Sequence, residues 1–136
     1  MITPVDYILK FNSSFYNPIM EEIKTSTIRA NSKPLNVGDI CYAYFNDIQT
    51  VMFVLITDHY AKRVMDLNKD DALTEGYLHE DLLKNELKNI YPDLAREDYV
   101  YIYKFKGLSV DEESQDLLEQ FLEQQKPNET TTDEEE

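Results

Sequence analysis

Cysteine and glycine are scarce in this 136-residue sequence, which has one cysteine and three glycines. With Cys41 as its single cysteine the chain cannot form an internal disulfide, which is typical of a reducing compartment. Three glycines are too few for a glycine-rich phosphate-binding loop. No apolar run approaches the ~18 residues of a membrane span, and the N-terminal residues lack the basic and apolar regions of a signal peptide. We therefore expect a cytoplasmic protein.

Basic residues are also few, with 13 Lys and Arg against 27 Asp and Glu and a net charge of −14. Residues 107–136 hold 11 of the acidic residues and one basic residue, so their net charge is −10, against −4 for residues 1–106. The nearly neutral body lacks the basic excess that non-specific nucleic-acid binding needs. We expect no membrane or duplex partner. A nucleic-acid ligand should be a free nucleoside or single-stranded RNA in a local pocket.

Metal-binding patterns are missing as well. His59 and His79 have no ligand spacing with each other or with Cys41, so neither a metal nor another cofactor is expected. Cys41 lies in an apolar run and is expected in the core.

The residues that are abundant predict one folded domain, because 42% are hydrophobic and 12% aromatic. Their patterning predicts the order β-α-β-β-β-α-α-β, followed by a C-terminal helix. The expected strands are residues 5–12, 25–29, 40–45, 49–58 and 98–106, and the expected helices are residues 13–23, 68–75 and 79–90. Short strands with hairpin signals favour an α+β fold built on a small, partly open β-barrel with flanking helices.

Capping and turn residues set the expected limits of these elements. Ser14 or Asn17 is the candidate N-cap of the first helix, and Asn68 that of the second. Asn46-Asp47 is expected at the tip of a hairpin.

The C-terminal part differs in composition from the domain expected over residues 1–107. Ser109-Val110-Asp111-Glu112 reads as a capping box that starts an acidic amphipathic helix over residues 108–126. Residues 127–136 are polar and acidic and are expected to be disordered. The helix is expected to pack on its own domain or on a protein partner through an apolar stripe of Leu117, Leu118, Phe121 and Leu122.

Polar side chains that could form a site gather in Lys24-Thr25-Ser26-Thr27-Ile28-Arg29. In an extended segment Thr25, Thr27 and Arg29 share one face, and Lys24 can fold towards it from the preceding helix. An ammonium and a guanidinium together bind phosphate, carboxylate or an oxyanion, and a neighbouring hydroxyl is a candidate nucleophile or donor. The alternative is a plain strand surface, with Lys24 at a helix C-terminus and Arg29 paired with a nearby glutamate.

The same segment resembles the Lys-x-x-Thr-x-Arg signature of ASCH domains, which have a PUA-like β-barrel. The resemblance covers about residues 5–106 in the right order. It also includes Gly38-Asp39, Thr74-Glu75-Gly76, Ile90-Tyr91-Pro92 and Tyr101-Ile102-Tyr103-Lys104-Phe105-Lys106. Within the family the chain is most similar to the small bacterial N4-acetylcytidine amidohydrolases.

The resemblance implies an amidohydrolase that removes the acyl group from N4-acetylcytidine or a related nucleoside. It implies Thr27 as nucleophile, Lys24 as base or oxyanion stabiliser and Glu75 as acid or base. Arg29 matches the signature arginine, and it is expected to bind substrate together with Thr25. Since the family also contains RNA-binding modules, the alternative is a module that binds RNA or a modified nucleotide, or a ribonuclease.

Two features depart from the family pattern. Glu22 stands where the family often has glycine, two residues before the lysine, and it adds a carboxylate near Lys24. The loop over residues 92–98 is longer than in the shortest members of the family.

Overall fold

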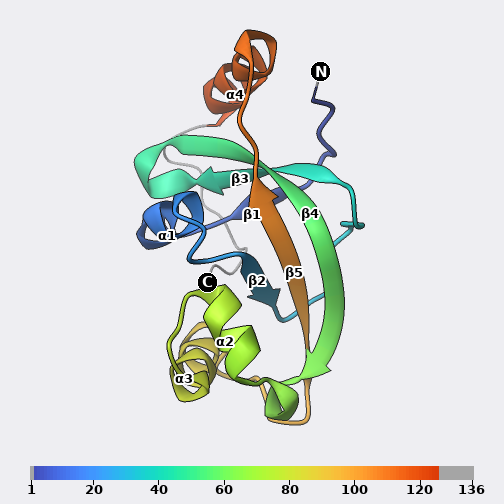
Figure 1. The fold of residues 1–136 in the computed structure, drawn as a ribbon, viewed down its shortest axis with the longest axis vertical. Coiled ribbons are helices and arrows are strands. Elements are labelled where there is room, and N and C mark those ends of the chain that lie inside the picture. The colour runs from blue at the N-terminus through green and yellow to red at the C-terminus, as the bar shows by residue number, and fades with distance from the viewer. Residues whose placement is uncertain (1, 126–136) are drawn as a thin grey trace.

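The computed structural model describes residues 2–125, which form a five-stranded sheet in the order β1-β3-β4-β5-β2. The strands are β1 (Ile8–Lys10), β2 (Ser26–Arg29), β3 (Ile40–Phe45), β4 (Thr50–Arg63) and β5 (Tyr99–Gly107). The pair β1–β3 is parallel and the other pairs are antiparallel. The sheet curls into a half-open barrel with β1 and β2 at its two edges (Figure 1). This α+β architecture confirms the predicted fold class.

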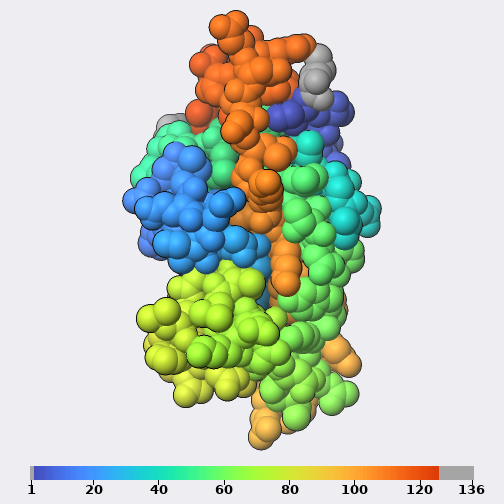
Figure 2. Space-filling model, viewed as in Figure 1, coloured from blue at the N-terminus to red at the C-terminus, as the bar shows by residue number. Residues whose placement is uncertain are grey.

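Four helices flank the sheet: α1 (Tyr16–Met20), α2 (Lys69–Glu75), α3 (Glu80–Ile90) and α4 (Glu112–Gln124). Short 3-10 turns occupy Ser13–Phe15, Asn46–Ile48 and Val64–Asp66. On the face that Figure 2 shows, α2 borders the segment between α1 and β2. Within residues 2–125, no helix has the length and apolar character needed to cross a membrane.

The strand β4 has 14 residues and extends beyond the predicted residues 49–58. Its first half pairs with β3 and its second half with β5, with an irregularity between Ile56 and Asp58. Residues 59–63 are polar and lack a strand signature, but the register pairs His59 with Tyr103 and Arg63 with Tyr99. The partner strand therefore extends β4 where local propensity does not.

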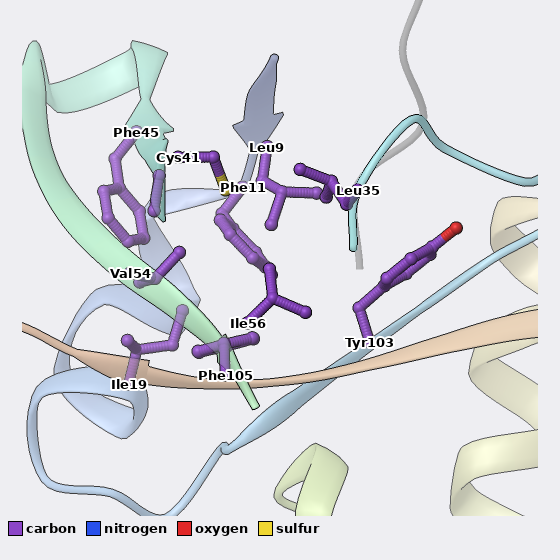
Figure 3. Close-up of a cluster of buried hydrophobic side chains, with 11 residues drawn as sticks. Leu9, Phe11, Ile19, Leu35, Cys41, Phe45, Val54, Ile56, Tyr103 and Phe105 are labelled. Carbon is purple, nitrogen blue, oxygen red and sulfur yellow. The ribbon is translucent and has the colours of Figure 1, made fainter. Parts of the chain in front are cut away.

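One hydrophobic core fills the inside of the curled sheet (Figure 3). Phe11 is stacked with Phe45 at 5.7 Å between ring centroids and meets Phe105 edge-on at 5.9 Å. Cys41 is fully buried here, as predicted. Burial raises the pKa of its thiol to about 12.

A second core lies on the other side of β2 and β5, under α2 and α3. Its buried members are Ile28, Leu67, Ala72, Leu83, Leu87, Tyr91, Val100 and Ile102. Leu83 and Leu87 confirm the helical period predicted for residues 79–90. Asn68 caps α2 as predicted, in a capping box with Asp71.

The helix α4 packs on the outside of β3 and β4 through Leu118 and Phe121. The Phe121 ring stacks on Tyr42, with 4.4 Å between centroids. The predicted capping box is wrong: the N-cap is Asp111, whose carboxylate accepts a hydrogen bond from the Ser114 amide. Residue 126 of the expected helix and the expected tail, residues 127–136, lie outside the described residues.

The predicted N-cap of the first helix is also wrong. The side chain of Asn12, rather than that of Ser14 or Asn17, caps the first helical segment by accepting from the Ser14 amide at 2.9 Å. Asn46-Asp47 lies at the tip of the β3–β4 hairpin, as predicted, within a 3-10 turn that is followed by Gln49 in the left-handed conformation.

Candidate functional site

The strand β2 carries the polar segment and is buried along its whole length. It pairs with β5, so that Thr27 lies opposite Tyr103 and Ile28 opposite Ile102. At its N-terminal end, the Thr25 amide donates to the Thr74 carbonyl at 2.6 Å. Because side chains alternate along a strand, Thr27 and Arg29 point to the core inside the curled sheet and Ser26 and Ile28 point to α2 and α3.

A carboxylate cluster, made of Lys24, Ser26, Thr74 and Glu75, lies on the α2 side of β2. Lys24 Nζ is 3.0 Å from Glu75 Oε1, and Ser26 Oγ donates to Glu75 Oε2. Ser26 Oγ is also 2.9 Å from Thr74 Oγ1. Lys24 and Glu75 are each 1% exposed, so both charges are held away from water.

A guanidinium cluster lies on the other side of β2 and contains Thr27, Arg29, Phe11 and Lys10. Arg29 Nε donates to Thr27 Oγ1 at 2.9 Å, and Arg29 Nη2 donates to the Lys10 carbonyl at 3.0 Å. The guanidinium lies over the Phe11 ring, 5.2 Å from its centroid. Thr27 is fully buried and Arg29 is 1% exposed.

The structure changes the predicted grouping of these side chains. Lys24 was predicted to lie with Thr25, Thr27 and Arg29, but its amine bonds to the carboxylate that Ser26 also contacts. The amine also lies 4.8 Å from the centroid of the Phe15 ring. Lys24 and Glu75 are therefore brought together, as are Thr27 and Arg29.

Ser26 was not among the predicted site residues. The signal that could have identified it is a hydroxyl in a short, otherwise buried strand, two residues after the lysine and on the face opposite Thr27. Its role depends on Thr74 and Glu75, which lie about fifty residues away in the sequence. Strand periodicity alone could not reveal that contact.

The backbone turns just before Lys24, and Glu22 lies in that turn. Glu22 has φ of 60°, in the left-handed region where glycine is favoured over residues with a Cβ. The glutamate thus adopts a conformation that glycine takes more readily. Gly76, which ends α2 beside Lys24, has φ of 96° and also needs this freedom.

Thr25 lies at a cavity next to Lys24. The cavity has a volume of about 330 Å³ and is lined by Ile19, Glu22, Lys24, Thr25, Thr57, Phe105, Lys106 and Gly107. A larger cavity of about 510 Å³ lies beside Tyr91, Tyr99 and Tyr101, near the start of β5. We take the smaller cavity as the approach to the site because it borders Lys24.

The charges around α2 are dominated by carboxylates. Asp71 accepts from Lys62 Nζ at 2.8 Å and from the Tyr60 hydroxyl at 3.2 Å. Burial, together with the carboxylates of Asp71, Asp58 and Glu75, raises the pKa of Tyr60 to about 12. Within the described part of the chain, no group of three or more His, Cys, Asp or Glu side chains could hold a metal ion.

No family model matches the sequence, and no curated protein sequence matches it significantly. The structure is similar to a protein from Enterococcus faecalis, with a TM-score of 0.66 and 12% identity over 84% of this chain and 83% of that chain. An ASCH protein from Zymomonas mobilis gives a TM-score of 0.59 and 13% identity over 90% and 82% of the two chains. An ASCH domain from Lactobacillus crispatus gives 0.57 and 12% over 74% and 79%. The chain therefore has the fold of the ASCH domains.

Proposed function

We propose that this protein is an amidohydrolase that removes the acyl group from N4-acetylcytidine or a related nucleoside, free or within single-stranded RNA. The observation that supports this function is the buried Lys24–Glu75 pair at the N-terminal end of β2, a strand whose opposite side carries the buried Thr27–Arg29 pair. A buried ion pair contributes little net stability because both charges lose their hydration. Buried, paired charges of this kind are more typical of sites that move protons.

Thr27 is suited to act as the nucleophile. Its Oγ1 accepts a hydrogen bond from the Arg29 guanidinium at 2.9 Å, which leaves the hydroxyl proton free to pass to a base. The permanent positive charge of the arginine also stabilises the negative charge that this oxygen gains as its proton leaves, before attack on the acyl carbon passes that charge to the acyl oxygen.

Lys24 and Glu75 then divide the remaining tasks of amide hydrolysis. The Lys24 amine is held 3.0 Å from the Glu75 carboxylate, and we assign it to stabilise the oxyanion rather than to act as a base. Glu75 is the acid or base: as a carboxylate it accepts a proton, and as the acid it donates one to the departing N4 amine of cytosine. Thr25 and Arg29 are assigned to substrate binding.

Release of acetate and cytidine from N4-acetylcytidine by the purified chain tests this function. We expect turnover by the wild type and a loss of about 100-fold or more in kcat for Thr27→Ala, Lys24→Ala and Glu75→Gln. The control is Thr50→Ala in the β3–β4 hairpin, which removes a threonine hydroxyl that bonds to the Ile48 carbonyl. This control should retain wild-type turnover, and circular dichroism should show that all four variants are folded.

Wild-type release of acetate no faster than in buffer would rule out the enzyme. Binding of the nucleoside or of single-stranded RNA without turnover, weakened by Arg29→Ala, would instead identify a binding module.

A further inference from the structure

We propose that Ser26 and Thr74 form a hydroxyl chain that positions Glu75 and satisfies its hydrogen bonds in both of its protonation states. In the terms of the function proposed above, Ser26 is then a positioning residue for the acid or base of the reaction. The chain runs from the Glu75 carboxyl through Ser26 Oγ and Thr74 Oγ1 to the main-chain carbonyl of Asp71, and each link is a hydrogen-bond contact.

When Glu75 is ionised, each hydroxyl proton of the chain has a defined acceptor. A carboxylate can only accept, so Ser26 must give its single proton to Oε2 of Glu75 while Lys24 Nζ donates to Oε1. The Thr74 hydroxyl donates to the Asp71 carbonyl at 3.0 Å, one turn back along α2. Every hydroxyl proton in the chain has an acceptor in this state.

The chain can reverse when Glu75 is protonated. The new acid proton then donates to Ser26 Oγ, and Ser26 turns its own proton to Thr74 Oγ1, 2.9 Å away. Thr74 still donates to the Asp71 carbonyl. Rotation of one buried hydroxyl therefore satisfies both states, and neither state leaves a buried donor without an acceptor.

The neighbours of Glu75 supply a fixed electrostatic background. Lys24 approaches from the segment before β2. Tyr60 on β4 interacts electrostatically with Glu75 and bonds to Asp71, and Asp71 on α2 is paired with Lys62 on β4. These groups are the same in any variant of Ser26 or Thr74, so differences between such variants report on the hydroxyl chain.

Two substitutions distinguish the two hydrogen-bonding arrangements of the hydroxyl chain, one with Glu75 ionised and one with Glu75 protonated. Ser26→Ala removes the donor to the ionised carboxylate. Thr74→Val keeps the shape of the side chain but removes the acceptor that Ser26 needs when Glu75 is protonated. The first variant should therefore disfavour the ionised form of Glu75, and the second should disfavour the protonated form.

The direct measurement is the protonation midpoint of Glu75, followed by carbon-detected NMR of its side-chain carboxyl as the pH is changed. Glu75→Gln identifies the signal. We expect the midpoint to rise by about one unit in Ser26→Ala and to fall by a similar amount in Thr74→Val, since one hydrogen bond to a charged group corresponds to roughly that shift. Ser114→Ala, a buried serine on α4, should leave it unchanged.

Kinetics give a second measurement if the wild type hydrolyses N4-acetylcytidine. Ser26→Ala should lower kcat by about 100-fold with little change in KM, because a misplaced Glu75 harms the reaction more than binding. Ser26→Thr, which restores a hydroxyl, should recover most of that loss. The acidic limb of the pH–rate profile should move with the NMR midpoint.

Shifts of the same sign in both variants, or no shift in either, would overturn the hydroxyl chain. Ser26→Cys, which keeps an atom at the γ position but offers only a weak donor, replaces Ser26→Ala if the alanine variant does not fold. The NMR midpoint can be measured whether or not the protein is active. A wild type without turnover would thus refute the proposed function and leave this inference to be decided by the titration.

Discussion

The two sides of β2 hold buried positive charge in different ways. On the α2 side, the Lys24 ammonium faces the Glu75 carboxylate, which can gain or lose a proton. On the inner side, the Arg29 guanidinium contacts the Thr27 hydroxyl, the Lys10 carbonyl and the Phe11 ring. Arginine stays protonated at any ordinary pH. The difference indicates that the first side is suited to transfer protons and the second to hold negative charge.

The largest expected effect comes from breaking the charge pair on the α2 side. Glu75→Ala leaves the Lys24 ammonium buried without this carboxylate and should lower the free energy of unfolding by about 3–5 kcal/mol. Chemical denaturation followed by circular dichroism measures it. The matched control replaces both charges, as Lys24→Met with Glu75→Leu, and should restore most of the stability because no buried charge remains. A double variant as unstable as Glu75→Ala would show that the pair itself stabilises the fold.

Substitutions on the inner side of β2 should lower the free energy of unfolding by less. Thr27→Val removes the hydroxyl that accepts from Arg29 Nε while keeping the shape of the side chain. The free energy of unfolding should fall by about 1–3 kcal/mol, the cost of a buried donor that loses an acceptor. Thr27→Ser keeps the hydroxyl, so its free energy of unfolding should fall less than that of Thr27→Val. A loss for Thr27→Val equal to that of Glu75→Ala would remove the proposed distinction between the two sides.

The smallest effect is expected at alkaline pH. The pKa of Tyr60 is raised from 10.0 to about 12, so its contribution to stability is fully present below pH 10 and is lost as the pH rises towards 12. Cys41, raised from 9.0 to about 12, acts with the same sign. Thermal unfolding of wild type and Tyr60→Phe between pH 9 and 11 measures the contribution of Tyr60. The Tm of the variant should fall less over this range than that of the wild type. Parallel decreases in Tm would contradict a role for Tyr60.

Much of the fold follows from local signals in the sequence. Leu83 and Leu87 show the helical period, Asn68 and Gly76 mark the limits of α2, and the apolar residues at 51–56 mark a buried strand. The second half of β4 could not be predicted, because its residues are polar and depend on pairing with β5. The start of α4 was missed because Ser109 and Asp111 are both good N-caps, and tertiary contacts decide between them.

The candidate site was harder to predict than the fold. Alternation correctly placed Thr27 and Arg29 on one face of β2. Lys24 lies outside the strand, after the left-handed turn at Glu22, so strand alternation does not determine its direction. Glu75 was predicted from the family resemblance alone. Ser26 could not be predicted, because its contact with Glu75 depends on how α2 packs against β2.

The bond from Arg29 to the Lys10 carbonyl has a mechanical consequence. The sheet has two free edges, β1 and β2, and this guanidinium reaches from one edge strand to the last residue of the other. This side chain therefore joins the two edge strands where no backbone ladder joins them. One buried guanidinium thus acts as a cross-brace between the first and last strands of the half-barrel, next to Thr27.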